Sequence, residues 1–213
     1  MTIKAVLWDF GGVLTTSPFE AFNRFEEKHQ MPRDFIRGIN ATNPEHNAWA
    51  QFESSSISLE EFDNKFAEES AAQGHRIPGR QVVELLSGHL RPRMVETLTR
   101  CKASLKVACI TNNVKSGAGP AMARSVSRAE EMAAVMALFD VVVESSVEGI
   151  RKPDPRIYTL TCERLGVDPA AAVFLDDLGV NLKPARALGM HTIKVLNEAQ
   201  AIDDLSAATG LDL

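Results

Sequence analysis

The sequence has few cysteines and no sign of an export signal. Its three cysteines, Cys101, Cys109 and Cys162, lack the spacing of a metal site. An odd number of cysteines without an export signal indicates reduced thiols, so we expect a cytoplasmic protein. Cys109 lies inside an apolar run, which predicts that it packs in the core as an unreactive thiol.

Long apolar runs and basic clusters are also lacking. No stretch approaches the roughly 20 apolar residues that cross a bilayer. The formal net charge is −5, and lysines and arginines form no dense group. We therefore expect neither a membrane nor a nucleic acid as partner. The oligomeric state stays open between monomer and homodimer, because no exposed stripe decides it.

The composition is that of an ordinary globular chain. It has 213 residues, of which 45% are hydrophobic and 24% are charged. This is enough for one medium domain, or for a domain with an inserted module.

The first apolar run ends at a carboxylate. Residues 5–8 (AVLW) have the length and character of a strand buried on both faces. Asp9 follows directly, and Gly11 and Gly12 break the pattern. Ligands of open parallel sheets bind outside the carboxyl ends of the strands, which is where Asp9 would lie.

The next part of the chain is helical in pattern. Phe19, Phe22 and Phe25 recur at helical spacing, and residues 58–61 (SLEE) resemble a capping box before another helix. Residues 40–47 are polar and predict a loop, residues 82–86 predict a further helical stripe, and no strand is evident up to Pro92. The segment therefore predicts a helical insertion.

After Pro92 strands and helices alternate. The predicted strands are 105–110, 141–143, 172–175 and 192–195, with helices between them and a loop at 116–120. Such alternation predicts an α/β fold with a doubly wound parallel sheet. We expect an α/β core from residues 1–15 and 93–213, and a helical cap domain from residues 16–92.

Polar residues follow four of the predicted strands. They are Asp9, the pair Thr111 and Asn112, Lys152, and the pair Asp176 and Asp177. Singly, Lys152 is explained by a solvated surface, Thr111-Asn112 by a turn, and Asp176-Asp177 by a helix cap. Together, at equivalent ends of one sheet, they predict a common crevice.

The chemistry of these groups is that of phosphoryl transfer. Carboxylates of Asp9 and Asp177 can hold Mg²⁺, and Asp9 is also placed to act as nucleophile. The Thr111 hydroxyl and the Asn112 backbone N–H can bind phosphoryl oxygens. Lys152 can offset the negative charge of the transferring group.

The chain resembles the haloacid dehalogenase (HAD) superfamily. The matching motifs are 8–14 (WDFGGVL), 109–113 (CITNN), 151–158 (RKPDPRIY) and 173–193 (VFLDDLGVNLKPARALGMHTI). Within it, the chain is most similar to the N-terminal phosphatase-type domain of soluble epoxide hydrolases, and residues 48–62 resemble the cap of that group. The resemblance implies a Rossmann-like core with an inserted cap and a Mg²⁺-dependent phosphatase acting on a small phosphomonoester.

The resemblance also implies roles for individual residues. Asp9 matches the nucleophile and first metal ligand, and the backbone carbonyl of Gly11 matches a further ligand. Thr111 matches the second motif, Lys152 the third, and Asp176 and Asp177 the acidic fourth, so both of these carboxylates are expected metal ligands as well.

One position departs from the phosphatase pattern. Gly11 stands where these phosphatases usually have a second Asp as general acid and base. The departure leaves open a slow phosphatase, a displaced acid such as Thr15 or Thr16, or a preference for good leaving groups. It also leaves open a metal-independent 2-haloacid dehalogenase and a non-catalytic phosphate-binding module, although the Asp176-Asp177 pair favours metal and phosphate.

The cap is expected to select the substrate. His46, Trp49 and Gln51 lie near the predicted polar loop and are candidates to reach the site. For Trp49 and Phe52 a packing role inside the cap is favoured.

Overall fold

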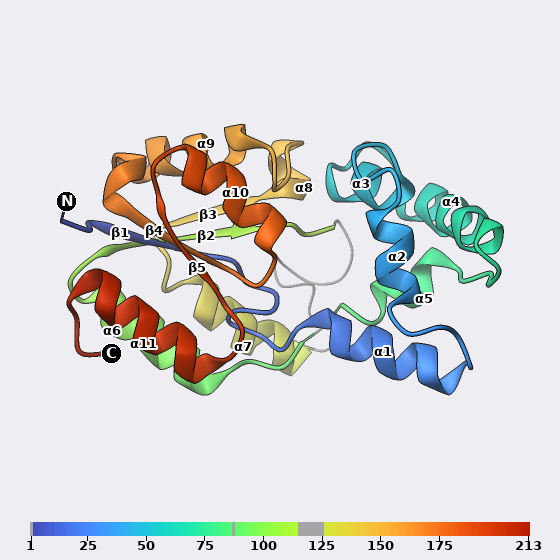
Figure 1. Cartoon of the computed structure of the whole chain (residues 1–213), viewed down its shortest axis with the longest axis horizontal. Coiled ribbons are helices and arrows are strands. Elements are labelled where there is room, and N and C mark those ends of the chain that lie inside the picture. The colour runs from blue at the N-terminus through green and yellow to red at the C-terminus, as the bar shows by residue number, and fades with distance from the viewer. Residues whose placement is uncertain (1, 87, 115–125) are drawn as a thin grey trace.

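A five-stranded parallel sheet forms the centre of the molecule (Figure 1). The computed structural model describes residues 2–86, 88–114 and 126–213, so the predicted loop at 116–120 lies outside the described residues. The strands are β1 (Ala5–Trp8), β2 (Lys106–Thr111), β3 (Val141–Glu144), β4 (Ala172–Asp176) and β5 (His191–Lys194). Their order is β3-β2-β1-β4-β5, and every pairing is parallel. The predicted α/β class is confirmed.

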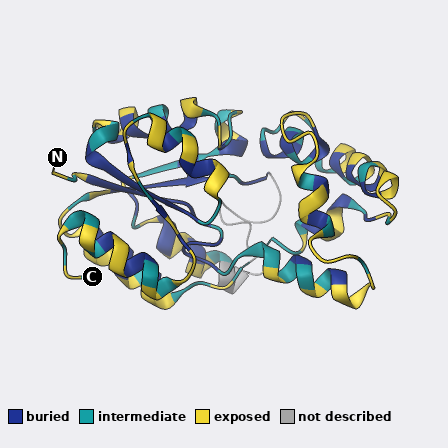
Figure 2. Ribbon diagram, viewed as in Figure 1, coloured by how far each residue is buried: buried dark blue, intermediate teal, exposed yellow. Residues whose placement is uncertain are grey.

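Helices cover both faces of the sheet, as expected of a doubly wound fold. One face packs against α6 (Pro92–Lys102), α7 (Val126–Met136) and α11 (Glu198–Thr209), and the other against α9 (Pro155–Leu165) and α10 (Gly179–Ala187). The short helices α8 (Ser145–Glu148) and η1 (Pro169–Ala171) complete the connections. Figure 2 shows the strands as the most deeply buried part of the chain.

The first strand owes its central place to its sequence. Val6 and Trp8 pack into the cluster on one face, whereas Ala5 and Leu7 pack into the cluster on the other. All four residues are fully buried. A strand with apolar residues on both sides is stable only inside such a sheet.

A separate group of helices lies between β1 and β2 in the sequence. It comprises α1 (Pro18–Lys28), α2 (Phe35–Ala41), α3 (Ala48–Glu53), α4 (Leu59–Ala72) and α5 (Gly79–Val83), and we call it the helical insertion. Between Trp8 and Lys106 the described residues form no strand beyond an isolated bridge between Thr15 and Leu90. The predicted capping box is present, with the Ser58 hydroxyl accepting from the Glu61 N–H.

The helical insertion has an apolar cluster of its own. Phe62 is fully buried at its centre and stacks on Phe52, with ring centroids 4.4 Å apart, while Trp49 packs edge-on against Phe62. Two details differ from the predictions. Helix α2 extends two residues into the predicted loop, to Ala41, and the stripe expected at 82–86 forms only the end of α5.

Two antiparallel segments connect the helical insertion to the sheet. The Thr16 N–H donates to the His89 carbonyl (2.8 Å), and the Arg91 N–H donates to the Leu14 carbonyl (2.8 Å). The predicted domain boundaries fall beside this crossing and remain a prediction.

The three cysteines are free and buried. Burial raises the pKa of Cys101 to about 12 and that of Cys162 to about 11, and it also raises the pKa of Cys109. The expected packing role of Cys109 is consistent with this. Among the described helices, none has both the length and the apolar character needed to cross a membrane.

Candidate active site

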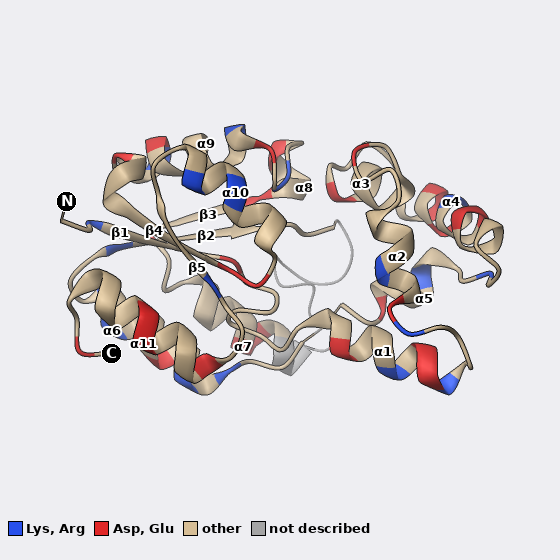
Figure 3. Ribbon diagram, in the orientation of Figure 1, with Lys and Arg blue, Asp and Glu red and all other residues tan. Residues whose placement is uncertain are grey.

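The sheet brings the predicted polar residues to one edge. Strand β1 lies between β2 and β4, and the Asp9 N–H donates to the Leu175 carbonyl (2.9 Å), which sets Asp9 beside Asp176. Lys152 comes from the segment after α8 and reaches the same point. Figure 3 shows acidic residues at this edge, facing the helical insertion.

Lys152 joins two of the carboxylates. Its Nζ lies 2.7 Å from Asp9 Oδ1 and 2.9 Å from Asp176 Oδ2, and its side chain is only 1% exposed. Burial lowers the pKa of Lys152, but the charges of Asp176 and Asp9 outweigh burial, so the net pKa is raised. Lys152 is therefore a fixed cation at the centre of the site, not a solvated surface lysine.

Asp176 is held by protein donors on every side. The Leu178 N–H donates to Oδ1 (2.8 Å), and Asn181 Nδ2 lies 3.0 Å from both carboxylate oxygens. With Lys152 on Oδ2, each oxygen has two partners, which fills its usual hydrogen-bonding capacity. This geometry suits a group that orients Lys152.

Asp177 is more open and lies against the loop after β1. It accepts a hydrogen bond of 3.4 Å from the Ser17 hydroxyl. Burial and the neighbouring Asp176 raise the pKa of Asp177 to about 6, against the opposing charge of Lys152. Its carboxylate is thus poised to gain from a nearby cation.

The two glycines after Asp9 play different structural parts. A Cβ at Gly12 would lie 2.2 Å from Asp177 Oδ2, and Gly12 has φ +78°, so glycine is required there. A Cβ at Gly11 would have no atom within 4 Å, and Gly11 lies outside the left-handed region. The sequence alone did not distinguish these two positions.

Three acidic groups converge at this edge. Asp9, Asp176 and Asp177 each offer a carboxylate oxygen, and the three oxygens lie within 4.8 Å of one another. Burial raises the pKa of Asp9 well above its ordinary value, while the charge of Lys152 opposes that rise. Clustered hard oxygen donors of like charge suit Mg²⁺, so the residues fit the expected metal.

The Asn112 side chain, directly after β2, holds the backbone of Lys152. The Asn112 side chain accepts from the Lys152 N–H (2.9 Å) and donates to the Lys152 carbonyl (2.9 Å). Thr111 is buried at the last position of β2. The Asn112 side chain thus orients the lysine, a contact that the sequence did not predict.

Several other candidates lie away from this edge. Gln51 donates to the His46 carbonyl and accepts from Lys65, and Trp49 packs on Phe62, so these contacts stay within the helical insertion.

The two threonines named as possible acids have other partners. The Thr15 hydroxyl lies 3.2 Å from the Thr16 carbonyl, and the Thr16 hydroxyl accepts from the His89 N–H (3.0 Å).

Sequence reasoning missed two residues that shape the site. One is Asn181, which is buried and holds both oxygens of Asp176. Its only signal is a polar side chain one turn into the helix after the Asp pair. The other is Arg91, whose side chain donates to the Gly12 carbonyl (2.8 Å) and carries no local signal.

Comparisons with known proteins agree with the fold. The family described as haloacid dehalogenase-like hydrolase matches residues 3–189. The chain is 35% identical to acyl-CoA dehydrogenase family member 10 of Mus musculus, over 99% of this chain and 19% of that protein. It is 32% identical to bifunctional epoxide hydrolase 2 of Sus scrofa, over 100% of this chain and 40% of that protein. The chain thus spans less than half the length of these two relatives.

A third relative and two solved structures extend the comparison. The chain is 27% identical to sesquiterpene phosphatase astK of Aspergillus oryzae, over 98% of each. L-2-haloacid dehalogenase from Xanthobacter autotrophicus has the same fold at 20% identity, with a TM-score of 0.62 over 99% of this chain and 85% of that one. The HAD family enzyme bt-2542 from Bacteroides thetaiotaomicron, in complex with magnesium and inorganic phosphate, gives 0.58 at 20% identity over 90% and 93%.

Proposed function

The chain belongs to the haloacid dehalogenase-like hydrolase family, and we propose that it is a Mg²⁺-dependent phosphatase acting on a small phosphomonoester. The observation that carries the proposal is the buried contact of Lys152 with Asp9, close to the carboxylates of Asp176 and Asp177. A relative named as a phosphatase supports the same reaction class.

In this proposal Asp9 is the nucleophile. Its free carboxylate oxygen attacks phosphorus, the bond from phosphorus to the ester oxygen breaks, and the alkoxide or phenolate leaves with the bonding electron pair and takes up a proton from solvent water. Water then attacks the phosphorus of the aspartyl-phosphate and releases inorganic phosphate and the Asp9 carboxylate.

The neighbouring residues position the phosphoryl group. Lys152 supplies a fixed positive charge for the developing negative charge, and Asp176 and Asn112 hold Lys152 in place. The Thr111 hydroxyl and the Asn112 backbone N–H bind phosphoryl oxygens. Asp9, Asp177 and the Gly11 carbonyl would hold Mg²⁺. Asp176, also expected as a ligand, already has two protein donors on each oxygen and would lie beside the ion. The ion would supply further charge neutralisation when bound.

Gly11 supports a second candidate function. No carboxylate stands two residues after Asp9, and the fold is shared with a haloacid dehalogenase. A halide is a good leaving group that needs no proton, so a metal-independent 2-haloacid hydrolase using Asp9 would not need an acid there.

A substrate screen separates these possibilities. Sugar, nucleotide, amino-acid, lipid and aryl phosphates are assayed with Mg²⁺ and with EDTA, and 2-chloropropionate is assayed for halide release. Phosphate release that EDTA abolishes supports the phosphatase. Halide release in EDTA overturns it, and binding of Mg²⁺ and phosphate without any turnover points to a non-catalytic module.

A further inference from the structure

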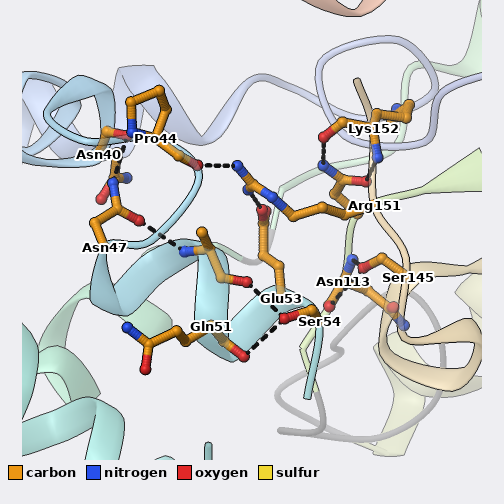
Figure 4. Close-up of polar contacts among 12 residues, drawn as sticks. Asn40, Pro44, Asn47, Gln51, Glu53, Ser54, Asn113, Ser145, Arg151 and Lys152 are labelled. Atoms are coloured by element: carbon orange, nitrogen blue, oxygen red, sulfur yellow. Dashed lines mark hydrogen bonds and ion pairs between the residues drawn. The ribbon is translucent and has the colours of Figure 1, made fainter. Parts of the chain in front are cut away.

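The segment that carries Lys152 also contacts the helical insertion. Arg151 points away from the site and donates through Nη1 to Glu53 Oε2, at the end of α3. Its Nη2 donates to the Pro44 carbonyl (2.7 Å), in the loop before α3. Figure 4 shows this arginine spanning the two regions, with Lys152 as its neighbour in the chain.

The ion pair is shielded from water on both sides. The Glu53 side chain is 9% exposed and that of Arg151 is 20% exposed. Burial raises the pKa of Glu53, although the charge of Arg151 opposes it. A shielded pair of this kind is strongly affected by loss of one partner, because the other charge is left buried and unpaired.

A second contact joins the same two regions nearby. The Ser55 hydroxyl donates to the Ser146 carbonyl (2.9 Å), and the Ser146 N–H donates to Asn113 Oδ1 (3.2 Å). Asn113 follows Asn112, whose side chain holds the Lys152 backbone. Both contacts from the end of α3 therefore lead to the residues that fix Lys152.

We propose that Glu53 is a positioning residue that sets Lys152 through Arg151, so that the lysine is fully aligned only while α3 is docked on the core. The inference rests on the proposed function for its kinetic consequence, but not for its structural one. Asn112, in the core, binds the backbone of Lys152, and Glu53, in the helical insertion, binds the neighbouring Arg151. Loss of the contact between Glu53 and Arg151 should loosen the backbone of 151–152 and misplace the ammonium group of Lys152.

The test compares Glu53→Gln with Glu148→Gln. Glu148 forms a bidentate pair with Arg164 (2.6 and 2.9 Å) within the core, so its change is a matched control that removes an ion pair without touching Arg151. In Glu53→Gln we expect the Lys152 amide, which donates to Asn112, to exchange with solvent at least tenfold faster than in Glu148→Gln. We expect kcat for an aryl phosphate to fall about 10- to 100-fold, since small misplacements of catalytic groups have costs of this size.

A double variant tests whether Glu53 acts through Arg151. If it does, Glu53→Gln combined with Arg151→Met loses no more kcat than Arg151→Met alone; additive losses would overturn the inference. The inference would also be overturned if Glu53→Gln is folded and its Lys152 amide exchanges with solvent at the same rate as in the unmodified protein. If the unmodified protein hydrolyses no phosphomonoester, the proposed function fails, and the exchange measurement still decides the role of Glu53.

Discussion

The sheet edge and the helical insertion are built on opposite principles. At the sheet edge, charged groups are buried and each is held by another polar group, as with Lys152 between Asp9 and Asp176. In the helical insertion, aromatic rings such as Phe62 fill the interior, and most charges lie on exposed faces, as on α1 and α4 (Figure 3), with Glu26 and Glu53 as buried exceptions. The first arrangement fixes the positions of reactive atoms, whereas the second provides stability through apolar burial.

This difference predicts that changes in the two regions have separable effects. A substitution at the sheet edge should alter chemistry while the fold persists. A substitution in the aromatic cluster should loosen the helical insertion while the sheet persists. Four experiments test how far the separation holds.

The largest expected effect comes from Asp9→Asn. The amide keeps the size of the side chain but removes the nucleophile, so we expect turnover of an aryl phosphate to fall by more than about 10³-fold. Far-ultraviolet circular dichroism should remain that of the unmodified protein.

Hydrolysis by Asp9→Asn at the original rate would show that Asp9 is not the nucleophile. Loss of the circular dichroism signal would show that the protein folds only when the Asp9 carboxylate compensates the buried charge of Lys152. Chemistry and folding would then not be separable at this residue.

The next effect concerns the missing acid. Without a general acid, an alkyl phosphate should react far more slowly than an aryl phosphate, because a phenolate leaves without protonation and an alkoxide does not. Gly11→Asp should raise the alkyl rate by up to ~10²–10⁴-fold and narrow that gap. The structure allows the change, since a Cβ at Gly11 has no atom within 4 Å.

Gly12→Ala is the matched control for this experiment. Its Cβ would lie 2.2 Å from Asp177 Oδ2, so it should lower activity on both kinds of ester. Equal aryl and alkyl rates in the unmodified protein would show that another residue already serves as the acid.

Much of the fold follows from local sequence patterns. The apolar run of β1 is recognisable because its residues face two apolar clusters. Helix α9 has an Asp154 N-cap, a proline at its first position and Gly166 at its end, all readable from the sequence. Helix α2 was not predicted because its N-cap residue, Asp34, makes no side-chain cap and has φ +61°.

The candidate site is only partly readable in the same way. The residues at the strand ends could be named, because parallel strands present their carboxyl ends together. The contacts among them depend on packing between distant segments, so the grip of Asn181 on Asp176 and of Glu53 on Arg151 could not be foreseen. The difference between Gly11 and Gly12 likewise depends on where Asp177 lies.

A change in the aromatic cluster should act on the helical insertion alone. Phe62→Ala removes a fully buried ring and should lower the free energy of unfolding of this region by about 3–5 kcal/mol. The chain has two tryptophans, Trp8 in β1 and Trp49 in α3, so their fluorescence reports the two regions separately in urea.

In Phe62→Ala the transition of Trp49 should move to lower urea while that of Trp8 moves less. Phe174→Ala, which removes an equally buried ring from β4, is the control, and it should move the Trp8 transition more than the Trp49 transition. Coincident transitions in Phe62→Ala would show that the two regions unfold as one.

The smallest effect tests whether the site lowers stability to keep its function. The pKa of Asp177 is about 6 in the folded protein, above its ordinary 3.8, so the folded state binds the proton more tightly than the unfolded state. Stability of the metal-free protein should therefore fall as the pH rises from about 4 to about 6. Asp177→Asn removes this titrating carboxyl group and should raise the free energy of unfolding at pH 7 in EDTA, by no more than about 3 kcal/mol.

Asp177→Asn should also lose stabilisation by Mg²⁺, because a ligand that binds only the folded state stabilises it.

Asp176→Asn is the contrasting control. Its carboxylate neutralises Lys152 at 2.9 Å, so its loss should destabilise the protein at pH 7. Urea unfolding between pH 4 and pH 8, with EDTA and with Mg²⁺, measures the stability of the unmodified protein and of both variants. If Asp177→Asn is less stable than the unmodified protein in EDTA at pH 7, Asp177 is a structural residue. The charge of Asp177 would then stabilise the folded protein, and the sheet edge, like the helical insertion, would contribute to stability as well as to chemistry.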